Sequence, residues 1–458
     1  MRYLLALVIA AALVAGGLFV YAGRLAGPAI EIARPTKYVG QATPLEVAIT
    51  APGARLTKVQ IVFEQNGKQT PLFSLDKPAA GDVKQEGADR VRITRTVGRE
   101  AVPGLKSGPA RIIVTAERPV LFGMRTAQAT ATHDVTVRLE RPAIAVLSTK
   151  HYVNLGGAEM VVYRATPADV ESGVQVGDLK YPGYPASGAK LEGVHITDPA
   201  VKIAFIALRY DQDVNTPMFA YAKDEAGNAA RADFDRLTFP KPFKKSRIDL
   251  DDKFLNRVVP AILETTTEVN PQGDIVQKFL VLNGELRRKN TAQIASFASQ
   301  SAPEMLWGGA VFHPFTNTAV ESAFADHRTY FYQGKEIDQQ THLGFDLARV
   351  VNSPVVAANR GKVLYAAPLG IYGNCVIVDH GMGVQSLYGH LSSITVQPGQ
   401  MVEKEQQMGL SGMTGMAGGD HLHFTMLVNG QMVNPVEWWD AHWIQDRILR
   451  KLHEASGS

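Results

Sequence analysis

The sequence has little cysteine and no excess of charge of one sign. A single cysteine, Cys375, among 458 residues excludes a disulfide within the chain. Because 47 Lys and Arg residues face 44 Asp and Glu residues, the formal net charge is only +3, and charge gives no reason to expect a nucleic-acid partner. Cys375 lies in the apolar run "GNCVIVDHG", so we expect a small buried hydrophobe there rather than a nucleophile.

Several common catalytic motifs are also missing. The sequence contains no H-E-x-x-H pair, no G-x-S-x-G elbow and no Walker loop. The usual sequence signatures of zincins, α/β-hydrolases and P-loop enzymes are therefore absent. At 458 residues the chain is too long for one ordinary domain, so we expect two to four.

One long hydrophobic run is present, at the N-terminus. Residues Tyr3 to Ala22 are apolar and lie between Arg2 and Arg24, and about 20 such residues cross a bilayer as a helix. A cleaved signal peptide has a shorter apolar core. We therefore expect residues 1–24 to be an uncleaved transmembrane anchor, with a signal peptide as the alternative. Either reading exports the chain: the anchor makes it a single-pass protein of the cell membrane, with its bulk in the periplasm or cell-wall space.

The rest of the chain is predicted to be mainly β and multidomain. Short strand-like runs broken by Gly, Pro, Asn and Asp predict a β-sandwich over 28–140. A second β-rich block, 141–240, contains "AKDEAGNA" and resembles the closing strands of bacterial immunoglobulin-like modules. Residues 241–305 read as a linker with helices, and 306–440 as a further folded domain. An amphipathic helix is expected over 441–458.

The C-terminal helix has an apolar stripe of Trp and aliphatic residues. Arg447, Arg450 and Lys451 are expected on the opposite, polar face. We expect the stripe to pack in the core, and the alternative is a helix that binds a membrane surface or a partner.

Histidines gather in the last third of the sequence, where nine of the twelve lie. "HLGFD", "YGH" and "HLH" fall within about eighty residues of one another. Around the last motif, the pattern predicts a strand, a hairpin at Asn429–Gly430 and a second strand. Because residues i and i+2 of a strand share one face, His421 and His423 are expected to project side by side, with Leu422 toward the core.

These motifs supply the ligand types of a zinc site. His342 and Asp346, together with one histidine of the HLH pair, make two imidazoles and one carboxylate, a set that suits Zn²⁺ with one open position for water. His390 and the other member of the pair could then transfer protons or stabilise an oxyanion. Taken alone, a pair of histidines in a strand is more often structural.

At these residues the sequence resembles the LytM/lysostaphin-type peptidases, peptidase family M23. The resemblance covers roughly residues 306–436 and includes, in family order, "THLGFDLA", "YGNCVIVDHG", "LYGHLSS", "HLHF" and "VNP". It implies a small antiparallel β fold with one zinc per chain. The implied zinc ligands are His342, Asp346 and His423. The implied catalytic residues are His390 and His421, with the choice of general base left open.

The resemblance implies a membrane-anchored zinc endopeptidase that cuts peptidoglycan stem peptides or cross-bridges. Its partners would be peptidoglycan peptides, the inner membrane through the N-terminal helix and envelope proteins, with no nucleic acid. One alternative is a non-hydrolytic scaffold that binds or activates other wall enzymes. Others are a latent enzyme and a peptidase for a different protein substrate. The stretch from 324 to 342 is longer than in compact members and is expected to form a wall of the cleft.

Overall fold

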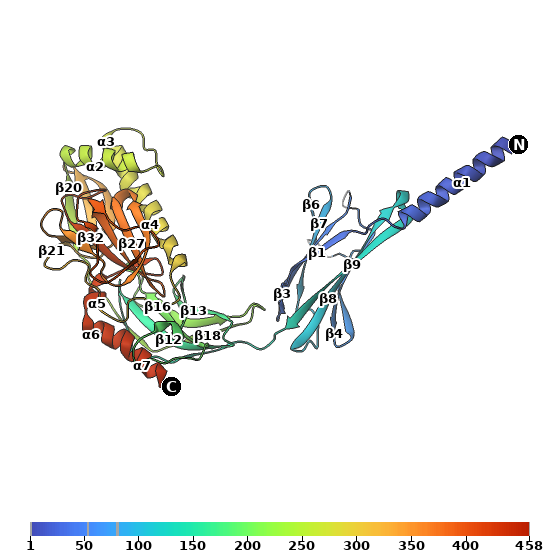
Figure 1. Ribbon diagram of the computed structural model, residues 1–458, viewed down its shortest axis with the longest axis horizontal. Helices are drawn as coiled ribbons and strands as arrows, with labels where there is room; N and C mark the ends of the chain where they lie inside the picture. The colour runs from blue at the N-terminus through green and yellow to red at the C-terminus, as the bar shows by residue number, and fades with distance from the viewer. Residues whose placement is uncertain (1, 53–54, 79–81, 458) are drawn as a thin grey trace. The chain divides into compact units, whose positions relative to one another are not determined.

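The computed structural model describes residues 2–52, 55–78 and 82–457. The chain divides into two compact units (Figure 1). Unit 1 comprises residues 1–142 with 223–230, and unit 2 comprises 143–222 with 231–458. Strands outnumber helices in both units, so the prediction of a mainly β, multidomain chain is confirmed.

Unit 1 begins with the helix α1 (Arg2–Ala22). Over Tyr3–Ala22 this helix is long and apolar enough to cross a membrane by length and composition. Its side chains are exposed except near its C-terminal end, where Ala22 is buried.

The remainder of unit 1 is a β-sandwich. One sheet has the order β1-β3-β7-β6 and the other β2-β9-β8-β4-β5. Alternation along β4 turns Val59, Ile61 and Phe63 inward, and they share one core with Val47 and Ile93 of the facing sheet. The elements are β1 (Ala29–Arg34), β2 (Tyr38–Val39), β3 (Thr43–Thr50), β4 (Lys58–Gln65), β5 (Lys68–Ser74), β6 (Val83–Glu86), β7 (Arg90–Val97), β8 (Gly108–Val120), the 3₁₀ turn η2 (Leu121–Gly123) and β9 (Arg125–Val137).

Unit 2 opens with a second set of short sheets. Their orders are β10-β12-β16-β15, β14-β13-β17-β18 and the parallel pair β11-β19. The elements are β10 (Ala143–Val146), β11 (His151–Asn154), β12 (Ala158–Thr166), β13 (Glu171–Val176), β14 (Leu179–Pro182), β15 (Tyr184–Pro185), η3 (Ala186–Ala189), β16 (Val201–Ala207), β17 (Met218–Lys223), β18 (Ala229–Asp233) and β19 (Arg236–Phe239).

A large antiparallel sheet forms the centre of the remaining part of unit 2. Its order is β21-β24-β32-β28-β27-β26-β30, and β33 pairs with β32. Two three-stranded sheets, β20-β22-β23 and β25-β31-β29, accompany it. The strands are β20 (Lys245–Leu250), β21 (Ala319–Ser322), β22 (Asp326–Tyr332), β23 (Lys335–His342), β24 (Phe345–Ala348), β25 (Pro354–Val356), β26 (Gly361–Pro368), β27 (Asn374–Gly381), β28 (Val384–Leu391), β29 (Ser393–Ile394), β30 (Met401–Val402), β31 (Gln407–Leu410), β32 (Leu422–Val428) and β33 (Gln431–Val433).

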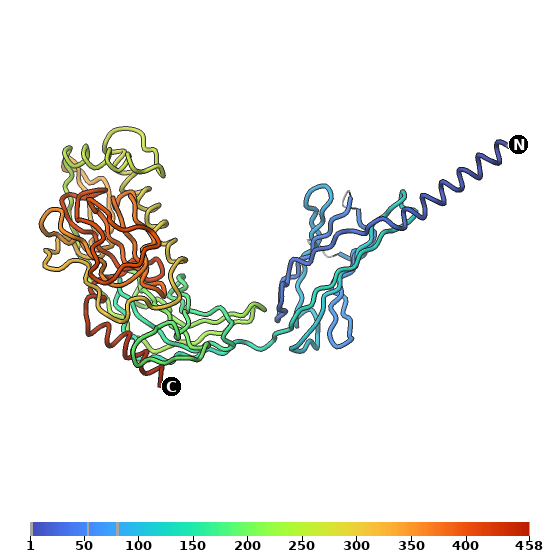
Figure 2. Tube along the Cα trace, in the orientation of Figure 1, coloured from blue at the N-terminus to red at the C-terminus, as the bar shows by residue number. Residues whose placement is uncertain are grey.

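Helices flank this sheet before and after it in the chain (Figure 2). Asp251 caps α2 by accepting from the Phe254 backbone N–H, and Asp274 with Gln277 forms a capping box at α3. The helical elements are α2 (Asp252–Thr265), α3 (Ile275–Val281), the π turn η4 (Leu282–Leu286), α4 (Arg287–Ser296), η5 (Phe297–Gln300), η6 (Gly370–Tyr372), α5 (Pro435–Trp439), α6 (Ala441–Ile444), the π turn η7 (Gln445–Leu449) and α7 (Arg450–Ser456).

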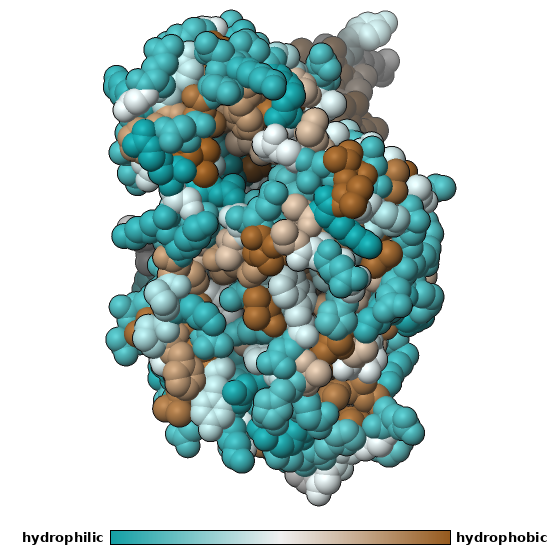
Figure 3. All heavy atoms as spheres, turned by 90° about the vertical axis from the view of Figure 1, so that its left-hand side faces the viewer, coloured by the Kyte–Doolittle hydropathy of each residue, from teal (hydrophilic) through white to brown (hydrophobic). Residues whose placement is uncertain are grey.

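One continuous apolar core runs through unit 2. The C-terminal helices contribute Trp438, Trp443, Ile448 and Leu452 to it, as the apolar stripe predicted. On the face of unit 2 in Figure 3, hydrophilic residues predominate and apolar ones are scattered.

The expectation for Lys451 was wrong. This side chain is fully buried, and its Nζ lies 2.7 Å from Glu159 Oε1 of β12 and donates to the Met160 carbonyl at 2.9 Å. Helical spacing predicted Lys451 on the solvent-exposed polar face. In the structure this side chain points to the buried carboxylate of Glu159, which needs a positive partner.

Candidate metal centre

Four strands bring the histidines and the aspartate together. Asp346 of β24 pairs directly with His423 of β32, and His423 also lies opposite Gly389 of the neighbouring β28. His342 ends β23 opposite Asp326 of β22. The pairing of Asp346 with His423 joins residues that are almost eighty positions apart in sequence, which spacing alone does not reveal.

Three side chains converge most closely. The carboxylate oxygen Oδ1 of Asp346 lies 2.9 Å from His342 Nε2 and 3.0 Å from His423 Nδ1. The two imidazole nitrogens are 3.0 Å apart. All three ligand atoms fall within 4.8 Å of one another, and all three residues are buried. The sequence-predicted ligand set is therefore assembled in one place.

The hydrogen bonds of the rings determine which nitrogen faces the centre. His342 Nδ1 lies 3.2 Å from the Ala323 carbonyl, which can only accept, so Nδ1 donates there and Nε2 is the nitrogen that faces the centre. His423 faces the centre with Nδ1. Its Nε2 is buried and has no hydrogen-bond partner within the described part of the chain.

Gly344 makes room for His423. An ideal Cβ at this position would lie 2.4 Å from His423 Cε1 and 2.5 Å from Nε2. A methyl group therefore cannot fit beside the ring in its present position. The structural role of this glycine is therefore to leave space for the imidazole.

His390 and His421 border the same centre. Their ring centroids are 4.9 Å apart, and His390 lies 5.7 Å from the His423 ring. His390 Nδ1 donates to the Thr414 carbonyl at 2.8 Å, and His421 Nδ1 donates to the Gly419 carbonyl at 3.0 Å. Each ring therefore keeps Nε2 for other partners, and His421 Nε2 lies 3.5 Å from Asp346 Oδ1.

A β-bulge directs His390 toward the pocket. The pairing of β27 with β28 shifts register between Asn374 and Val376, and His390 has a positive φ of 63°. Such a bulge turns a side chain that regular alternation would place elsewhere. The sequence signal for His390 was the motif around it, because a bulge cannot be read from residue alternation.

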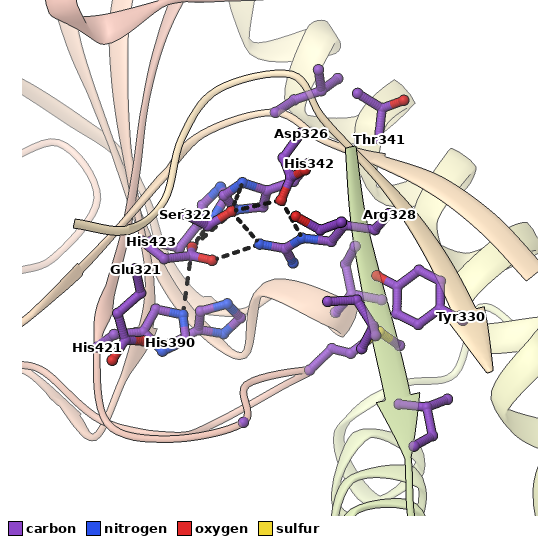
Figure 4. Close-up of a pocket in the computed structure, with 18 of the residues that line it drawn as sticks. Glu321, Ser322, Asp326, Arg328, Tyr330, Thr341, His342, His390, His421 and His423 are labelled. Atoms are coloured by element: carbon purple, nitrogen blue, oxygen red, sulfur yellow. Dashed lines mark hydrogen bonds and ion pairs between the residues drawn. The ribbon is translucent and has the colours of Figure 1, made fainter. Parts of the chain in front are cut away.

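Arg328 completes the centre and was missed by the sequence analysis. Its Nη2 donates to Asp346 Oδ2 at 2.9 Å and to Ser322 Oγ at 2.7 Å (Figure 4). It lies on β22, in the stretch expected to form a wall of the cleft, and that stretch is the β22–β23 hairpin, which lines the pocket. Its role depends on the packing of this hairpin against β24, for which the sequence carries no local signal.

The charges in the centre favour an ionised carboxylate. Burial alone would raise the pKa of Asp346, but the charge of His342 and hydrogen bonds from His342, His421 and His423 hold that pKa well below its usual range. Burial lowers the pKa of His423 to about 4. Burial and the neighbouring His421 and His423 also lower the pKa of His390.

All five predicted site residues line one pocket with a volume of about 580 Å³. The pocket also contains cations from several elements, namely Lys244, Arg247, Arg287 and Arg328. It is large enough to hold part of a peptide chain.

Three other polar or potentially reactive side chains of this domain are structural. Cys375 is fully buried, and burial raises the pKa of its thiol, as expected for a hydrophobe. His380 is buried between the Arg360 carbonyl at 2.8 Å and Ser386 Oγ at 2.7 Å. Tyr388 is also buried, and its hydroxyl accepts from the Ala358 N–H at 2.7 Å.

The donor set fits a zinc ion. Zinc in proteins takes imidazole nitrogens and carboxylate oxygens at about 2.0–2.2 Å, so that its tetrahedral ligand atoms lie about 3.3 Å apart. The 2.9–3.0 Å separations among His342, Asp346 and His423 are close to that spacing. A buried, ionised carboxylate between two imidazoles is also the arrangement that a cation would stabilise.

Comparison with known proteins gives a family for this region. Residues 340–435 match peptidase family M23. The sequence is 35% identical over 131 residues to the DD-carboxypeptidase/endopeptidase Mpg of Neisseria meningitidis serogroup B, covering 28% of this chain and 29% of that protein. It is 38% identical over 96 residues to the peptidoglycan DD-endopeptidase ShyA of Vibrio cholerae, covering 21% and 22%.

A third relative has a different described role. The murein hydrolase activator EnvC of Escherichia coli is 40% identical over 84 residues, covering 18% of this chain and 20% of that protein. The matched segments therefore span less than a third of each of these relatives.

Among solved structures, a putative M23 peptidase from Pseudomonas aeruginosa is 19% identical with a TM-score of 0.37, covering 63% of this chain and 94% of that one. The family assignment does not depend on this weak overall likeness. It rests on the match over residues 340–435, the region that carries β24, β28, β32 and all five predicted site residues. This part of the chain is a peptidase family M23 domain.

Proposed function

We propose that this protein is a zinc-dependent endopeptidase that hydrolyses peptide bonds in peptidoglycan stem peptides or cross-bridges. The observation that carries the proposal is the convergence of five side chains in one pocket. His342, Asp346 and His423 have their ligand atoms within 4.8 Å of one another, and His390 and His421 lie beside them. The endopeptidase names of the Neisseria and Vibrio relatives support the reaction class, and the name of the Vibrio relative, a peptidoglycan endopeptidase, also supports the wall as substrate.

In this mechanism His342 Nε2, Asp346 Oδ1 and His423 Nδ1 would hold one zinc ion. That ion would supply a Lewis acid that acidifies water and polarises the scissile carbonyl. Arg328 holds the second oxygen of Asp346 and keeps the first directed to the centre. His390 and His421 each keep Nε2 available, because Nδ1 is bonded to a backbone carbonyl. They accept and return protons or donate to the developing oxyanion.

The rest of the chain positions this domain in the cell envelope. Under this proposal α1 is a single-pass anchor in the cell membrane, and the bulk of the chain lies in the periplasm or cell-wall space. The β modules over 28–140 and 141–240 are spacers between the anchor and the peptidase domain over 306–440. The segment 241–305 connects them and 441–458 closes the domain.

The proposal is tested by zinc content and digestion of purified peptidoglycan sacculi, measured on the same full-chain preparation. The parent should hold about one zinc per chain and release new muropeptide ends. His423→Ala should lose both zinc and hydrolysis. His390→Ala and His421→Ala should keep zinc and lose roughly 10²- to 10⁴-fold in rate. A His423→Ala protein that digests sacculi at the parent rate would overturn the proposal.

The second candidate is a non-hydrolytic partner of other wall enzymes, which the EnvC relative favours. A scaffold has no use for a complete ligand set, whereas this chain has three metal-binding positions and two auxiliary histidines in place. If the parent chain contains no zinc, does not digest sacculi and accelerates a second hydrolase, the scaffold is correct. If it contains zinc but digests sacculi only when the N-terminal modules or the insertion before His342 no longer cover the cleft, it is a latent enzyme.

A further inference from the structure

The tip of the β8–β9 hairpin in unit 1 exposes large apolar side chains. Phe122 is 101% exposed and Met124 is 67% exposed. Leu121 and Phe122 also have positive φ values of 50° and 55°, a conformation that bulky residues rarely adopt. Exposed apolar side chains thus lie together at a strained turn, and this combination makes the tip a candidate interaction surface.

This tip lies against the C-terminal end of α1, which is visible in Figure 1 where the far end of β8 and β9 meets the helix. Ala22 of the helix, Val120 and Ala127 form a small apolar cluster of their own, and Leu25 and Leu121 pack against it. The hairpin tip is therefore level with the last turn of α1.

Arginines surround the same level. Arg125 donates from Nη1 to the Phe19 carbonyl at 2.6 Å, and its guanidinium lies 4.4 Å from the centre of the Phe19 ring. Arg118 donates from Nη2 to the Ala26 carbonyl at 2.8 Å. Apolar residues 120–124 are thus bracketed by two cations, and Arg24 adds a third next to the helix end.

We propose that residues 120–124 form a second membrane contact, in which Phe122 and Met124 insert into the outer interface of the bilayer that α1 spans. The inference rests on the proposed membrane anchoring by α1. At 1.5 Å per residue, the apolar span Tyr3–Ala22 is about 30 Å long, the thickness of the hydrocarbon core. Ala22 then lies at its outer boundary, and the tip that packs on Ala22 lies at the same depth.

A lipid surface fits this tip by chemistry as well as by depth. Aromatic and apolar side chains at the boundary enter the acyl region, while the exposed Arg24, just beyond the helix end, extends to the headgroup phosphates. The partner is therefore the bilayer itself rather than a soluble protein. With two contacts, the helix and the tip, the β-sandwich has a fixed orientation relative to the bilayer. A single flexible connection to the helix would not fix this orientation.

The test uses the full chain with one reporter dye on a cysteine. Because Cys375 is fully buried, Phe122→Cys provides the accessible thiol, and the unsubstituted parent gives the labelling background. Lys68→Cys is the matched control. It is exposed in the same sheet, and the pairing of β4 with β5 and β8 places it at the end opposite the tip. Both labelled proteins are reconstituted into vesicles of phosphatidylethanolamine and phosphatidylglycerol that carry a spin label at the top of the acyl chain.

We expect the Phe122 probe to shift to shorter emission wavelength and to be quenched severalfold more strongly than the Lys68 probe. A Met124→Cys probe should behave like the Phe122 probe and guards against a local effect of one substitution. Equal, weak quenching at both positions in protein that floats with the vesicles would overturn the proposal and leave the anchor intact. Protein that does not float with the vesicles would overturn the anchor and the tip contact together. Neither result depends on zinc or on hydrolysis.

Discussion

The two oxygens of Asp346 have different neighbours, and this difference defines what Arg328 does. Oδ1 faces the imidazoles of His342 and His423, whereas Oδ2 accepts from Arg328. A carboxylate held in this way can offer only one oxygen to a metal, in a fixed direction. Arg328 is thus a positioning residue that acts through Asp346.

Replacing Arg328 should therefore weaken zinc binding before anything else. We expect Arg328→Gln to lower zinc affinity by roughly 10- to 100-fold, the usual effect of removing a partner of a metal ligand. Competition with a zinc chelator measures this, and Arg288→Gln, an exposed arginine on α4, is the control. Unchanged zinc affinity with a raised KM would instead assign Arg328 to substrate binding.

Gly344 gives a second prediction that depends on space alone. Because a Cβ here would lie 2.4 Å from the His423 ring, Gly344→Ala should displace the imidazole and lower zinc affinity by roughly tenfold or more. The control is Gly418→Ala, which lies at the same pocket and has nothing within 4 Å of its added carbon. Zinc content and the melting temperature are measured together, so that a folding defect is recognised. Normal zinc binding by Gly344→Ala would contradict the steric argument.

Motif spacing predicted which residues would meet here but not what holds them. His342, Asp346, His390, His421 and His423 were named from sequence, because the motifs combine ligand types that zinc needs. Arg328 and the reason for Gly344 were not found. Both depend on contacts between β-strands that are neighbours only after folding, and a lone arginine in a polar strand carries no local signal. The assignment of a role to each histidine still awaits the variants described above.

At the scale of elements, residue patterns predicted a strand correctly where a turn with a recognisable sequence follows it directly. The hairpin of β32 and β33 follows the predicted Asn429–Gly430 turn, and both turn residues have the positive φ that such a turn requires. By contrast, β20 lies inside the segment read as a linker. It pairs in parallel with β22, about eighty residues away, and its "KSRIDL" sequence is largely polar. Only the long-range pairing identifies it as a strand.

A buried ion pair joins α7 to β12. Lys451 and Glu159 are both fully buried, and their Nζ–Oε1 distance is 2.7 Å. Lys451→Met would leave the Glu159 carboxylate without its cation in the core, so we expect a loss of about 3–5 kcal/mol in the free energy of unfolding. Chemical denaturation of the full chain measures this loss.

An exposed pair on another helix provides the comparison. Lys289 and Glu285 are 2.7 Å apart but 46% and 49% exposed, so Lys289→Met should cost no more than about 1 kcal/mol. If both lysine variants lost the same small amount, the buried pair would have no special role in holding α7. A partial rescue of Lys451→Met by adding Glu159→Gln would support the charge argument.

At the scale of the whole of unit 2, the β module and the peptidase domain share one core. Phe205 of β16 packs on Trp438 of α5 with ring centroids 6.1 Å apart, and Asn429 Nδ2 donates to the Phe205 carbonyl at 3.1 Å. Sequence patterns divided this region into separate modules because the composition changes along the chain. Contacts between two modules produce no periodic pattern in the sequence, so the shared core could not be predicted. The two parts are therefore expected to unfold together.

Glu437 makes this shared unit sensitive to pH. It is buried at the start of α5 and accepts from Asn154 Nδ2 and from the Ala158 N–H, both at 2.7 Å. Burial raises the pKa of this carboxyl to about 7, from an ordinary 4.5. At ~1.4 kcal/mol per unit, that difference corresponds to about 3 kcal/mol.

Because the folded state keeps this proton and the unfolded state releases it, stability falls as pH rises. The contribution is complete below pH 4.5, decreases between 4.5 and about 7, and is constant above that. Glu437→Gln cannot ionise and lacks this loss. The variant should therefore become more stable relative to the parent as pH rises across the same window. Glutamine also has one acceptor where glutamate has two, which adds a constant offset at every pH. The test is therefore how the free energy of unfolding, obtained from denaturation curves, changes with pH in each protein. If the free energies of parent and variant change in parallel from pH 4 to pH 8, Glu437 is already ionised in the folded chain.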